Sequence, residues 1–221
     1  MATVDRLDKK RQAGFRIVSE GTAKCAGVIL AGGQSRRMGM DKASLDFGGE
    51  TMLARVVRVL SATCSPIVVV AAPEQVLPEL PVDSVDIVRD RQTGRGPMEG
   101  LAVGLARANH AALVTTCDAP LITAAFVKRL LEFADWESFD AVVPIDSVRR
   151  YPLSAIYGPA ALSVIESRVQ SGKLKVIDML DEIRTRFVDA SELRNADPEL
   201  LSLLNINSPD EYEAIKQRFR L

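Results

Sequence analysis

Apolar and polar positions along this chain alternate in blocks that predict strands and helices in turn. Short continuous apolar runs, without polar residues between them, are typical of strands buried on both faces of a sheet. Apolar residues at a spacing of three and four predict helices between these runs. The expected strands are residues 25–31, 66–71, 85–88, 111–117, 141–144 and 153–157.

Capping residues mark where several of the expected helices begin. Thr51 and Thr123 precede helical patterns, and Ser208 begins a Ser-Pro-Asp-Glu capping box with proline at the first helical position. The expected helices follow Thr51, Gly96, Thr123 and Ser208, and two more cover residues 159–170 and 175–183.

This alternation predicts an α/β fold with three layers and a mostly parallel sheet. Residues 25–221 are expected to form a single domain, and the polar residues 1–24 a flexible N-terminal tail without the apolar core of a signal peptide. The 221 residues are 47% hydrophobic, which suffices for one core.

The overall charge favours no polyanionic partner. The chain has 28 basic and 29 acidic residues, so we expect neither a nucleic acid nor a membrane surface as partner. No apolar run is long enough to span a membrane. The three cysteines are far apart and form no metal-binding or disulfide pattern, which predicts a reducing, cytoplasmic location.

One loop after the first expected strand concentrates glycine and positive charge. Residues 30–42 read LAGGQSRRMGMDK, with Arg36, Arg37 and Lys42 downstream of two glycines. Glycine lets the backbone approach anionic oxygens closely, and arginine and lysine neutralise phosphate charge. The loop lacks the endings of a Walker loop and of a dinucleotide fingerprint. It predicts a polyphosphate site of another type; the alternative is a basic surface turn.

Two aspartates lie at strand ends that the fold brings to the same edge. Asp90 follows residues 85–88, and Asp118 follows residues 111–117. Carboxyl ends of parallel strands meet at one edge of a sheet, where α/β folds bind ligands. An aspartate beside a phosphate loop suggests a divalent cation between them, since Mg²⁺ takes one or two carboxylates together with phosphate oxygens. The alternative role of Asp118 is an Asx-turn before Pro120.

The loop resembles the L-A-G-G-x-S-x-R-M-G-x-D-K signature of nucleotidyltransferases, and most of all the molybdenum cofactor guanylyltransferases (molybdopterin-guanine dinucleotide synthases). Residues 115–122, TTCDAPLI, resemble the strand-D-x-P segment of that family, and residues 205–211, NINSPDE, resemble its N-x-N-[ST]-P-x-[DE] segment. The resemblance extends over residues 25–214. It implies a Rossmann-like nucleotidyltransferase fold.

The resemblance also implies an activity: transfer of GMP from GTP to the terminal phosphate of a molybdopterin-type cofactor, with release of pyrophosphate. Arg37, Lys42 and Asp118 would then be catalytic, with Asp118 holding Mg²⁺ and the two basic residues neutralising phosphates. Transient contacts with proteins that supply or accept the cofactor are a further expectation. The residues implied to bind nucleotide, metal or pterin are Leu30, Ala31, Gly32, Gly33, Lys42, Asp90, Asp118, Asn205 and Asn207.

Three positions depart from the family pattern. Ala71 stands where better-known members carry a polar residue, Glu99 adds a negative charge to a second glycine-rich turn, residues 94–100, and Tyr151 replaces His or Gln before a proline. We expect Glu99 to point away from the phosphates or to lie near the base. The alternatives are a cytidylyltransferase, another small-molecule nucleotidyltransferase of this fold, or a catalytically silent nucleotide-binding protein.

Overall fold

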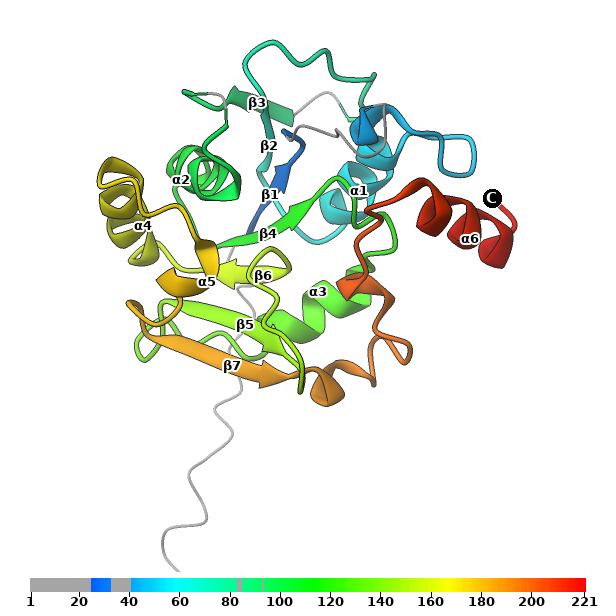
Figure 1. The fold of residues 1–221 in the computed structure, drawn as a ribbon. Coiled ribbons are helices and arrows are strands. Elements are labelled where there is room, and N and C mark those ends of the chain that lie inside the picture. The colour runs from blue at the N-terminus through cyan, green and yellow to red at the C-terminus, as the bar shows by residue number, and fades with distance from the viewer. Residues whose placement is uncertain (1–24, 33–40, 83–84, 93) are drawn as a thin grey trace, which may run out of the picture.

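The computed structural model describes residues 25–32, 41–82, 85–92 and 94–221, which build one seven-stranded sheet (Figure 1). The strand order is β3-β2-β1-β4-β6-β5-β7. Only β6 runs antiparallel to its neighbours, so the prediction of a mostly parallel sheet is confirmed. The strands are β1 Ala26–Leu30, β2 Ile67–Ala71, β3 Val85–Arg89, β4 Ala112–Thr116, β5 Ala141–Ile145, β6 Ala155–Tyr157 and β7 Thr185–Asp189.

Helices cover both faces of the sheet and complete the three layers. Apolar side chains of α1 (Met52–Ser61) and α3 (Ala124–Leu131) pack on one face. Those of α2 (Pro97–Ala108), α4 (Ala161–Gln170) and α5 (Val176–Met179) pack on the other face. The remaining helices are α6 (Pro209–Phe219) and the short 3-10 helices η1 (Lys42–Ser44), η2 (Ala190–Leu193) and η3 (Leu201–Leu203).

The central strand β1 explains why its sequence is apolar throughout. Val28 and Leu30 join the core under α2, whereas Ile29 joins the core under α1 and α3. Gly104 lets α2 lie close to this strand, because a Cβ there would come within 2.4 Å of Val28 Cγ1. Burial on both faces makes alternation with polar residues impossible in β1.

The capping predictions are confirmed. The Thr51 side chain accepts a hydrogen bond from Ala54 N, and the Thr123 side chain accepts one from Phe126 N. Ser208 and Glu211 form the complete capping box of α6. These bonds satisfy N–H groups that a helix start otherwise leaves without a partner.

The segment after α4 differs from the expectation. The helix predicted over residues 175–183 is only Val176–Met179, and the strand β7, Thr185–Asp189, was not predicted. β7 lies at the edge of the sheet and pairs with β5 alone. Its sequence TRFVD has few apolar residues, since an edge strand is partly exposed.

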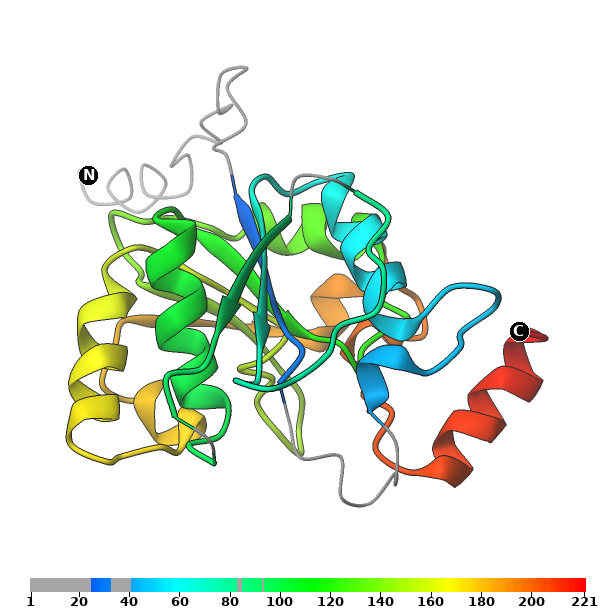
Figure 2. The same cartoon turned by 90° about the horizontal axis from the view of Figure 1, so that it is seen from above.

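The carboxyl ends of β1, β2, β3 and β4 lie along one edge of the sheet (Figure 2). A third apolar cluster joins α6 to the segment between β1 and α1 through Phe47, Met52, Ile206 and Ile215. This packing brings residues 205–207 to the same edge, because Ile206 N also donates a hydrogen bond to Asp118 O at 2.8 Å. In the part of the chain that the structure describes, no helix is long and apolar enough to cross a membrane.

The predicted tail, residues 1–24, lies outside the described residues. The division into a tail and a single domain therefore stays a prediction.

Candidate functional site

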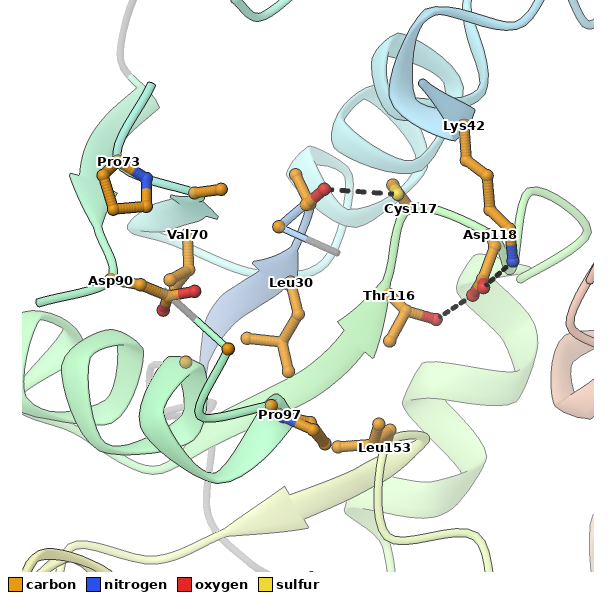
Figure 3. Close-up of a pocket in the computed structure, with 16 residues that line it drawn as sticks. Leu30, Lys42, Val70, Pro73, Asp90, Pro97, Thr116, Cys117, Asp118 and Leu153 are labelled. Carbon is orange, nitrogen blue, oxygen red and sulfur yellow. Dashed lines mark hydrogen bonds and ion pairs between the residues drawn. The ribbon is translucent and has the colours of Figure 1, made fainter. Parts of the chain in front are cut away.

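A cavity of about 500 Å³ opens at the carboxyl edge of the sheet, and we call it the edge pocket. The ends of β1, β2 and β4, the residue after β3 and the first turn of α2 line it. Figure 3 shows Asp90 at one end of the edge pocket, Lys42 and Asp118 at the other, and Leu30 between them. The convergence of these strand ends, predicted from the sequence, is confirmed.

The backbone after β1 forms one wall of the edge pocket. Leu30, Ala31 and Gly32 all line it. A Cβ on Gly32 would lie 3.0 Å from Ala72 N and 3.2 Å from Asp90 Oδ2, so a side chain there would require its neighbours to shift by a few tenths of an ångström. A main-chain wall of this kind can approach a ligand closely. The predicted residues Gly33 and Arg37, like Arg36, lie outside the described residues.

Asp118 is the centre of a hydrogen-bonded network at one end of the edge pocket. Lys42 Nζ donates to Asp118 Oδ2 at 2.8 Å, and both side chains are largely buried, with 15% and 16% of their surface exposed. Thr116 Oγ1 donates to Asp118 Oδ1 at 2.5 Å, and Asn205 Nδ2 donates to the same oxygen at 2.8 Å. Burial strengthens these bonds, because the low dielectric screens them less than water would.

The two predicted asparagines belong to this network. Asn205 Nδ2 also donates to Thr116 Oγ1 at 3.1 Å, and Asn207 Oδ1 accepts a hydrogen bond from Lys42 Nζ at 3.1 Å. Their amides therefore hold Asp118 and Lys42 in place. A contact of either asparagine with a pterin stays a prediction.

The other end of the edge pocket is acidic and incompletely bonded. Among the described residues, Asp90 Oδ1 has no hydrogen-bond partner, and neither does Glu99 Oε2. Burial, and secondly the negative charge of Glu99, raise the pKa of Asp90 to about 6. Glu99 is only 2% exposed, and its Oε2 lies 3.4 Å from Arg95 Nε. Glu99 is thus near enough to Asp90 to act on it electrostatically. Its expected placement away from the phosphates or near the base stays a prediction.

The backbone turn before α2 fits the glycines of its sequence. Gly96 precedes the helix with a φ of 68°, in the region that favours glycine. Pro97 occupies the first helical position, where its missing N–H has no consequence. Gly94, Gly96, Pro97 and Gly100 line the edge pocket.

Sequence reasoning missed three residues that shape the site: Thr116, Gln75 and Arg89. Arg89 Nη1 donates to the carbonyl oxygens of Ala72, Pro73 and Gln75 at 2.7, 3.0 and 3.1 Å. The Gln75 side chain bonds to groups far from it in sequence. No local motif marks such contacts; the one available signal was that Thr116 precedes Asp118 by two residues at a strand end.

Two carboxylates, Asp90 and Asp118, line the edge pocket, at opposite ends of it. In the ranges that the structure describes, no three His, Cys, Asp or Glu residues are grouped so that they could hold a metal ion. The only histidine, His110, is exposed in the connection between α2 and β4. Any metal here would need ligands from a substrate as well as from Asp118.

Comparison with known proteins identifies the family. Residues 27–183 match the model of the MobA-like NTP transferase domain. The chain belongs to this family. It is 33% identical over 85% of its length to the probable molybdenum cofactor guanylyltransferase of Pelotomaculum thermopropionicum, of which 90% is covered. It is 34% identical to the molybdenum cofactor guanylyltransferase of Desulfosudis oleivorans, over 85% of this chain and 92% of that one.

Solved structures share the fold. Molybdopterin-guanine dinucleotide biosynthesis protein A from Archaeoglobus fulgidus superposes with a TM-score of 0.75 at 23% identity, covering 88% of this chain and 98% of that one. The 2-C-methyl-D-erythritol 4-phosphate cytidylyltransferase from Thermus thermophilus superposes with a TM-score of 0.65 at 17% identity, covering 90% of this chain and 100% of that one. The predicted Rossmann-like nucleotidyltransferase fold and the predicted family are therefore confirmed.

Proposed function

We propose that this protein transfers GMP from GTP to the terminal phosphate of a molybdopterin-type cofactor, forming the guanine dinucleotide and pyrophosphate. Relatives that span most of the chain bear the name molybdenum cofactor guanylyltransferase. The observation that carries the proposal is the polarity of the edge pocket, with a lysine–aspartate pair at one end and at the other the half-buried Asp90, whose Oδ1 has no hydrogen-bond partner among the described residues.

This polarity fits a nucleotide in one orientation. The phosphates would lie at the Lys42 end, where a positive charge is held in place, and the base at the Asp90 end. Guanine presents an amino group and a ring N–H as donors, and the Asp90 carboxylate, which lines the edge pocket, can accept hydrogen bonds. The backbone of Leu30, Ala31 and Gly32 would run along the nucleotide between the two ends.

The proposed reaction needs little proton transfer from the protein. A phosphate oxygen of the cofactor would form a bond to the α-phosphorus of GTP, and the bond to the oxygen of the leaving pyrophosphate would break. A terminal phosphate is largely ionised near neutral pH, since its second pKa is about 6, so no general base is required. Positioning of two anions and neutralisation of charge by Lys42 and Arg37 would supply the rate enhancement.

We propose that Asp118 holds the Mg²⁺ that such a reaction uses. A carboxylate offers about four lone-pair sites; three donors occupy Asp118 here, two at Oδ1 and Lys42 at Oδ2. One position at Oδ2 thus fits a cation whose other ligands are phosphate oxygens and water. When bound there, Mg²⁺ would supply positive charge to the phosphates.

A cytoplasmic location is part of the proposal. All three cysteines are buried and unpaired, which suits a reducing environment. Transient contacts with proteins that supply or accept the cofactor stay a prediction.

The first test is a calorimetric titration of the protein with GTP, CTP, ATP and UTP, each with and without Mg²⁺. We expect tightest binding of GTP with Mg²⁺, and then release of pyrophosphate and formation of the guanine dinucleotide, detected by mass spectrometry, once molybdopterin is added. Preference for CTP would replace guanylyl by cytidylyl transfer. Binding of GTP without pyrophosphate release in the presence of molybdopterin would show a silent nucleotide-binding protein.

A further inference from the structure

The Gln75 side chain lies where three segments of the edge pocket come together. Its Nε2 donates to Ala31 O at 3.0 Å and to the Asp41 carboxylate, at 2.9 Å to Oδ2 and 3.2 Å to Oδ1. Its Oε1 accepts a hydrogen bond from Ala72 N at 3.1 Å. A primary amide has two N–H donors and one acceptor oxygen, so Gln75 uses both kinds of group here. Gln75 thereby joins the end of β1, the end of β2 and the start of η1.

Each partner of Gln75 has a place in the site. Ala31 and Ala72 line the edge pocket. Asp41 caps η1 by accepting a hydrogen bond from Ala43 N at 3.1 Å. Lys42, the next residue, donates to Asp118. One side chain thus connects the wall beside Asp90 with the lysine at the phosphate end.

The wall that Gln75 holds is also fixed from its other side. Arg89 donates to three carbonyl oxygens of the segment 72–75, among them Gln75 O. Ala71, the last residue of β2, has only a methyl side chain, so it cannot orient this wall through a side-chain hydrogen bond. Gln75 and Arg89 instead fix its backbone before any ligand arrives, and such preorganisation lowers the entropy lost on binding.

We propose that Gln75 is a positioning residue that couples nucleotide binding at the Ala31–Ala72 wall to the placement of Lys42 beside Asp118, acting through Asp41. The proposal rests on the proposed nucleotidyl transfer in the edge pocket. It assigns Gln75 no contact with the reacting atoms.

The variant Gln75→Glu tests the proposal with the smallest change in shape. A carboxylate at this position would face the Asp41 carboxylate and the Ala31 carbonyl, so two attractive contacts would become repulsive. We expect the Kd for GTP, measured by calorimetry, to rise at least about fivefold, and kcat for pyrophosphate release to fall at least about fivefold. The matched control Gln170→Glu changes an exposed residue at the end of α4 and should leave both constants unchanged.

The second variant separates positioning from general damage to the fold. In Gln75→Glu combined with Asp41→Asn, the new amide can donate to the new carboxylate, and we expect at least half of the lost kcat to return. All constants are measured at one temperature, about 20 °C below the lowest melting temperature among the variants, where every variant is folded. A residue that only stabilised the fold would change the melting temperature without changing kcat or Kd.

The outcomes distinguish this proposal from the proposed function. Wild-type kcat and Kd in Gln75→Glu, with an active wild-type protein, would overturn the positioning role alone. Loss of activity in Gln75→Glu that Asp41→Asn fails to relieve would overturn the coupling through Asp41. A wild-type protein that binds no nucleotide in calorimetry, alone or with molybdopterin, would overturn the proposed function and this proposal with it.

Discussion

The two ends of the edge pocket differ in how their charged groups are satisfied. At the Lys42 end, where we propose that the phosphates bind (the phosphate end), Lys42, Thr116 and Asn205 all donate hydrogen bonds to Asp118. At the Asp90 end, where we propose that the base binds (the base end), Asp90 Oδ1 is buried without a hydrogen-bond partner among the described residues, and the buried Glu99 Oε2 has only the 3.4 Å ion-pair contact with Arg95. Because a buried polar atom without a partner is unfavourable, the base end is the less completely hydrogen-bonded of the two ends. The phosphate end is instead preformed and needs only to hold its geometry.

The largest effect is expected from the variant Asp118→Asn, which disrupts the hydrogen-bonded network at the phosphate end. In either orientation of the new amide its NH2 group would face a donor, Lys42 Nζ on one side or Asn205 Nδ2 on the other, and the negative charge for a cation would be lost. We expect turnover with Mg²⁺ to fall at least about a hundredfold, a barrier increase of about 2.7 kcal/mol. The rate of pyrophosphate release measures this turnover.

The matched control for this variant is Asp86→Asn. Asp86 pairs with Arg107 at 2.7 Å, but both side chains are considerably exposed, and such surface pairs contribute little. We expect wild-type turnover from this control. An Asp118→Asn protein with more than half of the wild-type rate would remove Asp118 from the metal site.

A smaller effect is expected from Lys42→Ala at the same end. The variant removes the cation that we place at the phosphates and leaves Asp118 without its ion pair. We expect turnover to fall at least about tenfold, a barrier increase of about 1.4 kcal/mol. The control Lys128→Ala, exposed on α3, should match the wild type in the same assay. Unchanged turnover in Lys42→Ala would exclude Lys42 from the mechanism.

The base end should respond to pH, since the pKa of Asp90 is raised from 3.8 to about 6. An ionised carboxylate accepts hydrogen bonds from guanine, and a protonated one loses part of that capacity. We expect the affinity for GTP to weaken up to about tenfold between pH 7.5 and 5, as Asp90 takes up its proton. Calorimetry of wild type and Asp90→Asn checks this, because the variant should lose the pH dependence. An identical pH profile in both would show that Asp90 does not contact the base.

The same group should make the stability of the ligand-free protein fall as pH rises. The folded state binds the Asp90 proton more tightly than the unfolded chain does, so the favourable contribution is present below pH 3.8 and is lost as pH rises through about 6. Thermal unfolding of Asp90→Asn between pH 5 and 8 should therefore show a variant that gains stability over wild type as pH increases. A stability difference that does not change with pH would contradict the raised pKa.

The two ends also differ in how far the sequence could predict them. Asp90 and Asp118 each follow an apolar run that predicts a strand. Because the carboxyl ends of parallel strands lie along one edge of a sheet, the sequence predicted both aspartates at that edge. The hydrogen bond from Asn205 to Asp118 spans 87 positions, and the one from Gln75 to Asp41 spans 34. No local pattern encodes contacts of that range, because they depend on how the sheet and α6 pack. The sequence therefore predicted which segments meet and did not predict which side chains bond.

The secondary structure, too, was predictable in some elements and not in others. Helix α1 was predictable because Thr51 caps it and its apolar residues lie on one face. Strand β7 was not, because only Phe187 and Val188 are large apolar residues in it and pairing with β5 decides its structure. Local signals suffice where burial is complete, and they fail where tertiary pairing holds a partly exposed segment.

The smallest effect is expected from Glu99→Gln, which separates the two causes that raise the pKa of Asp90. Burial is the larger cause and the charge of Glu99 the smaller one. The variant keeps the shape of Glu99 and removes its charge, so the pH midpoint of GTP binding should move to lower pH while staying above the ordinary value for aspartate. At pH 7.5, where Asp90 is ionised in both proteins, we expect Kd to change less than about threefold, under about 0.7 kcal/mol. Calorimetric titrations at several pH values measure the midpoint, with the exposed Glu213→Gln as control. An unchanged midpoint would mean that burial alone raises the pKa of Asp90. The charge of Glu99 would then have no effect on GTP binding.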